Sequence, residues 1–156
     1  MSKLYKSFVV FVLLLGMSGW QGCRHVNSSN PKVIVAVRAN DAANLCKSIS
    51  DGLVAADKTL DGIQSQEPDY YAQVKPWLVK IATLNDVAAK QVLAYEKGDT
   101  SSNWQGTMQQ ISTVSTQLDP TVFGFKNPDT QTKVKEGFTL LQASIASVIQ
   151  LFGSTK

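Results

Sequence analysis

Residues that could carry out chemistry are few in this sequence and lie far apart. The only histidine, His25, stands two residues after Cys23, outside the predicted folded body, so no histidine-based acid–base pair or metal cluster can form there. A dinuclear carboxylate site in a four-helix protein needs a histidine three residues after a glutamate, and none of Glu67, Glu96 and Glu136 has one. We therefore predict no catalytic residue, no metal site and no cofactor, and we expect the protein not to be an enzyme.

Two carboxylates share one helix face. Asp57 and Asp61 are four residues apart, a spacing that could present both to a calcium ion. Lys58 lies between them and all three belong to the polar side of the helix, which favours a solvated face over a metal site. Glycine-rich phosphate loops, nucleophile elbows and CxxC motifs are absent from the sequence.

Three aromatic residues gather near the start of a predicted helix. Tyr70, Tyr71 and Trp77 could form a flat surface for a sugar ring or for a side chain of a partner, and we retain them as weak candidate partner contacts. The alternative is internal packing against an apolar loop that contains Phe123 and Phe125. We favour packing, because aromatic residues at helical spacing usually belong to a core.

A long helix is predicted from Val33 to Ile63. Its apolar residues alternate at spacings of four and three, which places them on one stripe of the helix surface. The stripe consists of Val35, Ala39, Ala42, Cys46, Ile49, Leu53, Ala56, Leu60 and Ile63. Because Cys46 falls on this stripe, we expect its thiol to be buried and unreactive.

A second helix is predicted from Pro68, since proline suits a first helical turn, to Gly98, which is typical of a helix end. Its stripe is Val74, Leu78, Ile81, Asn85, Ala88, Val92 and Tyr95, widened by Trp77, Leu84 and Val87. Pro76 inside the pattern should kink or restart the helix. Asn85 either specifies the register of packing or lies at a rim where its amide reaches water, and we favour the rim.

A third, shorter helix is predicted between a cap at Ser101 or Ser102 and a stop at Asp119-Pro120. The residues on its stripe are Trp104, Met108, Ile111, Ser115 and Leu118. The loop after it carries Val122, Phe123 and Phe125. Since apolar loop residues usually fold back onto a core, we expect this loop to cover one end of the bundle.

A fourth helix is predicted to begin at Asn127-Pro128, a capping residue followed by proline, and to end at Gly153. The residues on its stripe are Val134, Phe138, Leu141, Ile145, Val148 and Phe152. Four amphipathic helices joined by short turns predict an all-α, up-down-up-down four-helix bundle. We assign this single domain to residues 33–156, with a polar tether at 23–32 and a leader at 1–22.

The leader has the composition of a signal peptide. Lys3 and Lys6 precede an unbroken apolar run from Phe8 to Leu15, and a stretch rich in glycine and serine follows. Eight helical residues rise only about 12 Å, against about 30 Å for the hydrocarbon core of a membrane. We therefore expect the leader to be cleaved after export rather than to span the membrane.

The leader ends at Gly22-Cys23, which resembles the lipobox of bacterial lipoproteins. The resemblance implies that fatty acyl chains such as palmitate are attached to Cys23 and that cleavage after Gly22 makes Cys23 the mature N-terminus. In lipoproteins of many Gram-negative bacteria an aspartate in the next position favours the inner membrane. Arg24 stands there, so the resemblance implies the periplasmic face of the outer membrane if the source is Gram-negative.

An ordinary signal peptide is the alternative interpretation of the leader. Cys23 would then be a free thiol or would form a disulfide with Cys46, because an oxidising periplasm favours the pairing of two cysteines. If Cys23 carries lipid instead, this disulfide cannot form.

Charge and composition narrow the choice of partner. The formal net charge is +3, and Lys3 and Lys6 of the leader supply two of these charges, so we expect no nucleic-acid binding. We predict a membrane-anchored lipoprotein of the bacterial cell envelope, whose bundle is a non-enzymatic interaction or structural module for an envelope protein or the cell wall. The alternative is a carrier or sensor of a small apolar ligand, for which Ala39, Ala42, Ala56 and Ala88 are the only hint.

Overall fold

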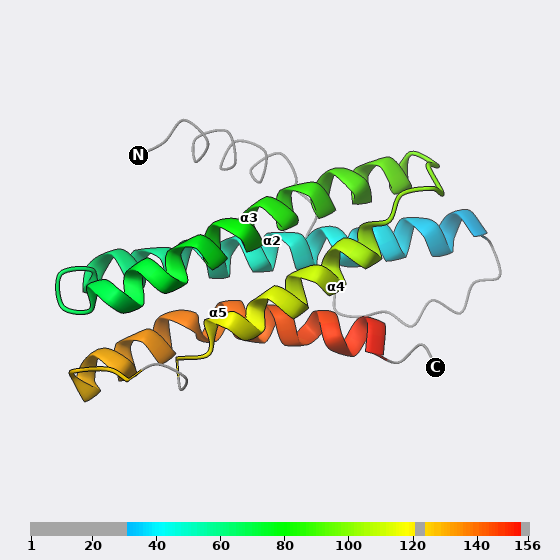
Figure 1. Cartoon of the computed structure of the whole chain (residues 1–156). Helices are drawn as coiled ribbons and strands as arrows, with labels where there is room; N and C mark the ends of the chain where they lie inside the picture. The colour runs from blue at the N-terminus through cyan, green and yellow to red at the C-terminus, as the bar shows by residue number, and fades with distance from the viewer. Residues whose placement is uncertain (1–30, 121–123, 154–156) are drawn as a thin grey trace.

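The computed structural model describes residues 31–120 and 124–153, which fold into four α-helices and one short 3₁₀ helix without a β-strand (Figure 1). These elements are α2 (Pro31–Ile63), α3 (Pro68–Glu96), α4 (Trp104–Ser115), η1 (Thr116–Leu118) and α5 (Pro128–Gly153). Helices α2 and α4 each pack against both α3 and α5. The predicted all-α four-helix bundle is confirmed.

Helix α2 supplies one wall of the core. All of its predicted stripe from Ala39 to Ile63 is buried, while Val35 near its start is half-buried. The helix begins at Pro31, two residues before the predicted boundary, because proline is tolerated in a first turn. None of the described helices is both long and apolar enough to span a membrane.

Helix α3 differs from its prediction at three residues. It runs without interruption through Pro76, and both Pro76 and Ala72, whose carbonyl loses its helical partner, are exposed to water. The prediction that the helix restarts at Pro76 is therefore wrong. Val87 is 39 % exposed and does not widen the buried stripe. The rim position favoured for Asn85 is also wrong, since this residue is 2 % exposed in the core.

Gly98 ends α3 as predicted. Its φ of +100° is a left-handed conformation that suits glycine. The Gly98 amide donates to the carbonyl of Tyr95 and the Asp99 amide to that of Ala94, each over 3.0 Å. These two bonds form a Schellman motif, which satisfies carbonyls at the end of the helix.

The predicted caps of α4 at Ser101 and Ser102 are wrong. Asn103 is the cap, and its side-chain oxygen accepts a hydrogen bond from the Gly106 amide over 3.3 Å. Ser102 instead donates from its hydroxyl to the carbonyl of Gln91 over 2.6 Å. After α4 the short helix η1 carries the chain to Leu118, which is buried as predicted.

The start of α5 is confirmed. The Asn127 side chain accepts from the Asp129 amide over 2.9 Å, and the helix begins at Pro128. Its buried apolar residues are Val134, Phe138, Leu141, Ile145 and Val148. The predicted stripe position of the Phe152 side chain, like Val122 and Phe123 of the preceding loop, lies outside the described part of the structure.

Helices α2 and α5 approach each other closely. A Cβ atom added at Gly52 would lie 2.6 Å from the Cα of Leu141, and one added at Gly137 would overlap the side chain of Thr59. Along the same interface the hydroxyls of Ser48 and Ser144 share a hydrogen bond of 2.6 Å. Glycine at positions 52 and 137 is therefore a packing requirement.

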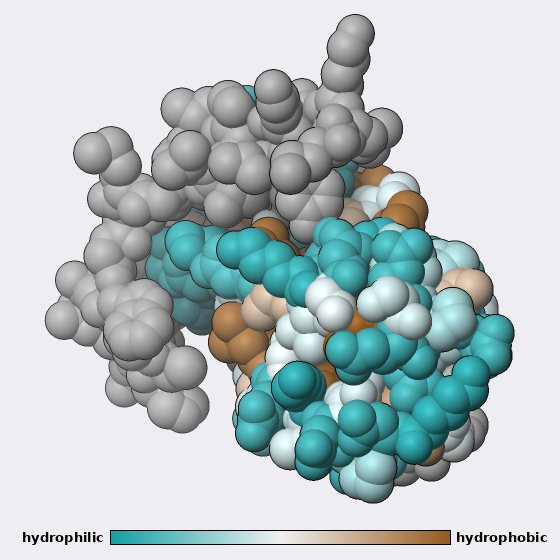
Figure 2. Space-filling view, turned by 90° about the vertical axis from the view of Figure 1, so that its left-hand side faces the viewer, coloured by the Kyte–Doolittle hydropathy of each residue, from teal (hydrophilic) through white to brown (hydrophobic). Residues whose placement is uncertain are grey.

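The two ends of the bundle differ in their connections. Helix α2 begins at the end that also holds the connection from α3 to α4 (Figure 1). The opposite end holds the α2–α3 turn and the start of α5, and Figure 2 shows its described surface to be mostly hydrophilic.

Candidate functional site

Of the three candidate aromatic residues, Tyr70 is a core residue. It is 4 % exposed, and its ring centre lies 4.7 Å from that of Phe125. Burial, aided by the negative charge of Asp119, raises the pKa of Tyr70. The ring therefore packs under the loop that precedes α5, the arrangement favoured from the sequence.

Tyr71 and Trp77 are half-buried and lie on opposite flanks of α3. The amino group of Lys75 lies 5.4 Å from the ring centre of Tyr71, and that of Lys80 lies 5.4 Å from the Trp77 ring. Lys75 reaches α2 through ion pairs. On the other flank Tyr95, five helical turns after Trp77, contacts Trp104 of α4. The three candidate rings thus form no common surface, and their contact with a partner stays a prediction.

Asp57 and Asp61 bind a lysine of the neighbouring helix. Lys75 of α3 donates to Asp57 over 2.6 Å and to Asp61 over 2.8 Å. Burial by itself lowers the pKa of Lys75, but the two carboxylates outweigh it and the pKa is raised. Among the described residues no three His, Cys, Asp or Glu side chains are placed to hold a metal ion. The two ion pairs of Lys75 with Asp57 and Asp61 thus link α2 to α3.

Cys46 is a free thiol on α2, and it is buried as its spacing predicts. Burial raises its pKa to about 12, and a hydrogen bond with its own backbone opposes this shift. A thiol reacts as the thiolate, so Cys46 is poorly placed for nucleophilic chemistry. Cys23 lies outside the described residues.

Asn85 is a buried polar group that the sequence analysis placed at the surface. Its side-chain amide donates to the Cys46 carbonyl of α2 over 2.9 Å. Its side-chain oxygen is buried and accepts no hydrogen bond from the described residues. The residue joins two helices within the core.

Glu67 is a second buried polar group, and the sequence analysis missed it. Its carboxylate accepts from the backbone amides of Lys126 and Asn127 over 2.9 and 3.3 Å. Beside it the Thr130 hydroxyl donates to the Gln66 side chain over 3.2 Å. These contacts tie the α2–α3 turn to the start of α5. Glutamate before proline in a turn is normally solvated, so no local signal marks its burial.

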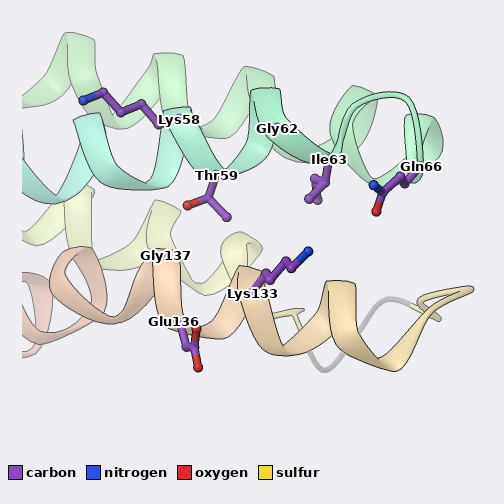
Figure 3. Close-up of a pocket in the computed structure, with 8 residues that line it drawn as sticks. All are labelled: Lys58, Thr59, Gly62, Ile63, Gln66, Lys133, Glu136 and Gly137. Atoms are coloured by element: carbon purple, nitrogen blue, oxygen red, sulfur yellow. The ribbon is translucent and has the colours of Figure 1, made fainter.

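An open pocket lies between the second half of α2 and the first half of α5 (Figure 3). Its volume is about 520 Å³. The residues that line it are Lys58, Thr59, Gly62, Ile63, Gln66, Lys133, Glu136 and Gly137. No local sequence pattern marks this pocket, because its lining comes from segments separated by the whole of α3 and α4.

Comparisons with protein family models, with curated proteins and with solved structures found no match to this chain.

Proposed function

We propose that the protein is an exported, lipid-anchored component of the bacterial cell envelope, whose helical bundle is a non-enzymatic interaction or structural module. The observation that carries the proposal is the position of Cys23. It follows a charged start and a short apolar run, and only residues 24–30 separate it from Pro31, where the bundle begins.

The dimensions of the chain limit how far the bundle can extend from the membrane. Residues 24–30 reach at most about 25 Å when fully extended. Helix α2 has 33 residues, which corresponds to a length of about 50 Å. A lipid on Cys23 would hold the start of α2 within about 25 Å of the membrane surface and would let the α2–α3 turn reach up to about 50 Å further out.

The distal end of the bundle, which holds the α2–α3 turn and the start of α5, has a polar surface. Its described residues are mostly hydrophilic (Figure 2). Glu67 links the two connections there through buried hydrogen bonds, which favours a stable shape for this end. A firm, polar surface held away from the membrane suits an interaction with an envelope protein or with the cell wall.

The alternative role as a carrier of a small apolar ligand has weaker support. Ala39, Ala42, Ala56 and Ala88 suggested it from the sequence. All four are buried within the core of the bundle. Small residues in such positions favour close packing of helices, which needs no ligand.

The test is membrane fractionation of the full chain produced in a Gram-negative host, combined with labelling by radioactive palmitate. The unaltered chain should carry label and sediment with membranes. Cys23→Ser should lose the label and either become soluble or remain as an uncleaved precursor. Cys46→Ser is the matched control and should retain label and sedimentation. A Cys23→Ser variant that is cleaved and still sediments with membranes would refute the proposal.

A further inference from the structure

We infer that the start of α2 inserts into the surface of an anionic phospholipid bilayer, the membrane that the proposed anchor at Cys23 enters. This inference rests on the proposed lipid anchor and names the partner of one end of the bundle. It is carried by three properties of residues 31–38, which are their position, their apolar composition and the charges that flank them.

The first two turns of α2 project beyond the end of α5. The two helices run antiparallel, and the hydrogen bond between Ser48 and Ser144 places these two residues at the same level. Helix α5 ends at Gly153, nine residues after Ser144, and the residue of α2 nine positions before Ser48 is Ala39. Residues 31–38 therefore lie beyond the end of α5, over about 12 Å of helix. Figure 1 shows the start of α2 reaching further than the nearby ends of α3, α4 and α5.

The residues of these projecting turns are apolar all the way round the helix. Residues 33–37 read Val-Ile-Val-Ala-Val, and five consecutive residues make more than one full turn of about 3.6 residues. Within this run Ala36 is exposed and Val35 is half-buried, whereas Ala39 belongs to the core. A helix that faces water normally carries polar residues on that side. An apolar helix start that leaves the core suits the boundary between lipid headgroups and acyl chains, into which apolar helix faces sink by about 5 to 10 Å.

Basic residues flank the apolar run. Lys32 precedes it, Arg38 follows it, and both are exposed. Arg24 directly follows Cys23, and the first acidic residue after that cysteine is Asp41. Lysine and arginine have apolar stems, so at a membrane interface their charges lie among the lipid phosphates. The flanks of the run therefore complement an anionic bilayer.

The net charge of this end and the short tether favour the same contact. The end of α3 and its connection to α4 contribute Glu96, Lys97 and Asp99, a net charge of −1. Residues 24–40 contribute +3 with histidine neutral, so the sum stays positive even when Asp41 is counted. A lipid on the cysteine at the far end of the tether keeps this positive end close to the bilayer, where a weak attraction is sufficient.

The experiment measures fluorescence quenching of the lipidated protein, purified from host membranes and reconstituted into vesicles of phosphatidylcholine and phosphatidylglycerol. A fraction of the lipids carries a nitroxide quencher on the headgroup. Ala36→Cys takes the fluorescent label, because Cys46 is buried and a lipidated Cys23 has no free thiol. Ser65→Cys, at an exposed position in the α2–α3 turn, is the matched label control. The label at position 36 should be quenched at least about threefold more strongly, because about 40 Å of α2 separates the two positions.

Charge variants of the Ala36→Cys protein test the role of the basic flanks. Lys32→Gln combined with Arg38→Gln should weaken the contact about fivefold for each charge removed. Vesicles of phosphatidylcholine alone and added salt should weaken it in the same direction, because both reduce the attraction between the charges. Lys58→Gln combined with Lys133→Gln is the matched control, since it removes two exposed lysines from the distal half of the bundle. Its quenching should equal that of the Ala36→Cys protein.

A further variant tests the apolar run. Val33→Gln combined with Val37→Gln keeps both flanking charges and should also reduce the quenching of the label at position 36. A thermal melt of each variant establishes that the bundle is folded.

Three results would overturn the inference. The labels at positions 36 and 65 could be quenched equally, quenching could be the same without phosphatidylglycerol, or the distal lysine pair could matter as much as Lys32 and Arg38. If the Val33 and Val37 variant fails to fold, the comparison of the two charge variants decides alone. Palmitate labelling separates this inference from the anchoring proposal. A lipidated chain whose label at position 36 is not quenched would refute the inference alone, whereas a chain without palmitate would refute the anchor and the inference with it.

Discussion

Asn85 of α3 donates a hydrogen bond to the backbone carbonyl of Cys46 on α2 over 2.9 Å, in the interior of the bundle. The bond fixes the alignment of the two helices, because a buried amide that slips by one turn loses its partner. The oxygen of the same side chain accepts no hydrogen bond within residues 31–120 and 124–153, which lowers the net gain in stability.

Asn85→Asp should destabilise the protein by about 3 to 5 kcal/mol at pH 7, because it buries a carboxylate beside the Cys46 carbonyl. Burial raises the pKa of such a carboxyl above its unfolded value of about 3.9, so the stability of the variant relative to the original should increase as pH falls toward that value. Urea unfolding at pH 4 and pH 7 measures both effects. Asn85→Leu, similar in size but without polar atoms, should stay within about 1.5 kcal/mol of the original. Equal stability of Asn85→Asp and the original protein at pH 7 would contradict the buried contact.

Gly52→Ala should lower the free energy of unfolding by about 1 to 3 kcal/mol, because its Cβ would meet the backbone of Leu141, which cannot turn aside. Gly137→Ala should cost a similar amount against the branched side chain of Thr59. Gly62→Ala is the control and should stabilise the helix by up to about 1 kcal/mol, since open space surrounds it. Urea titrations compare the three variants. If all three variants have the same free energy of unfolding, α2 and α5 are further apart than described.

Glu67→Ala should lower the free energy of unfolding by about 2 to 4 kcal/mol, because two backbone amides would lose a charged acceptor. Glu67→Gln keeps a side-chain oxygen and should cost about half as much. Hydrogen exchange at the Lys126 amide should become faster in the alanine variant. Glu96→Ala, at an exposed position, should change stability by less than about 0.5 kcal/mol. Unchanged exchange at Lys126 in Glu67→Ala would exclude a role for Glu67 in holding this segment.

Cys46 should react with a thiol reagent such as dithionitrobenzoate in the folded Cys23→Ser chain only as fast as the bundle unfolds, because its thiol is buried and protonated. Its folded pKa of about 12 exceeds the reference value of 9.0, so its contribution to stability is complete below pH 9 and is lost as pH rises toward 12. Cys46→Ala should therefore show a shallower loss of stability between these pH values. Rapid labelling at neutral pH without denaturant would show that Cys46 is accessible.

The spacing of apolar residues determined the helices and their buried faces. Helix periodicity is a local property, so the stripe from Ala39 to Ile63 and the stripe of α5 from Val134 to Val148 could be predicted residue by residue. Terminal signals were local too, and Gly98 and Asn127-Pro128 end and begin helices as expected. The cap at Asn103 was missed because several adjacent residues can serve as caps, and the geometry of the connection selects one.

Tertiary structure decided everything that depends on which helices meet. Asn85 is buried because the Cys46 carbonyl of α2 faces it, and Glu67 is buried because the loop before α5 supplies two amides. The pocket exists because α2 and α5, which are distant in the sequence, lie side by side and contribute Gly62 and Gly137 to its lining. Burial of a polar group is stable only with a partner, and the sequence shows the group without its partner. The leader is the opposite case, because its charged start, apolar run and Gly22-Cys23 exit form a purely local pattern.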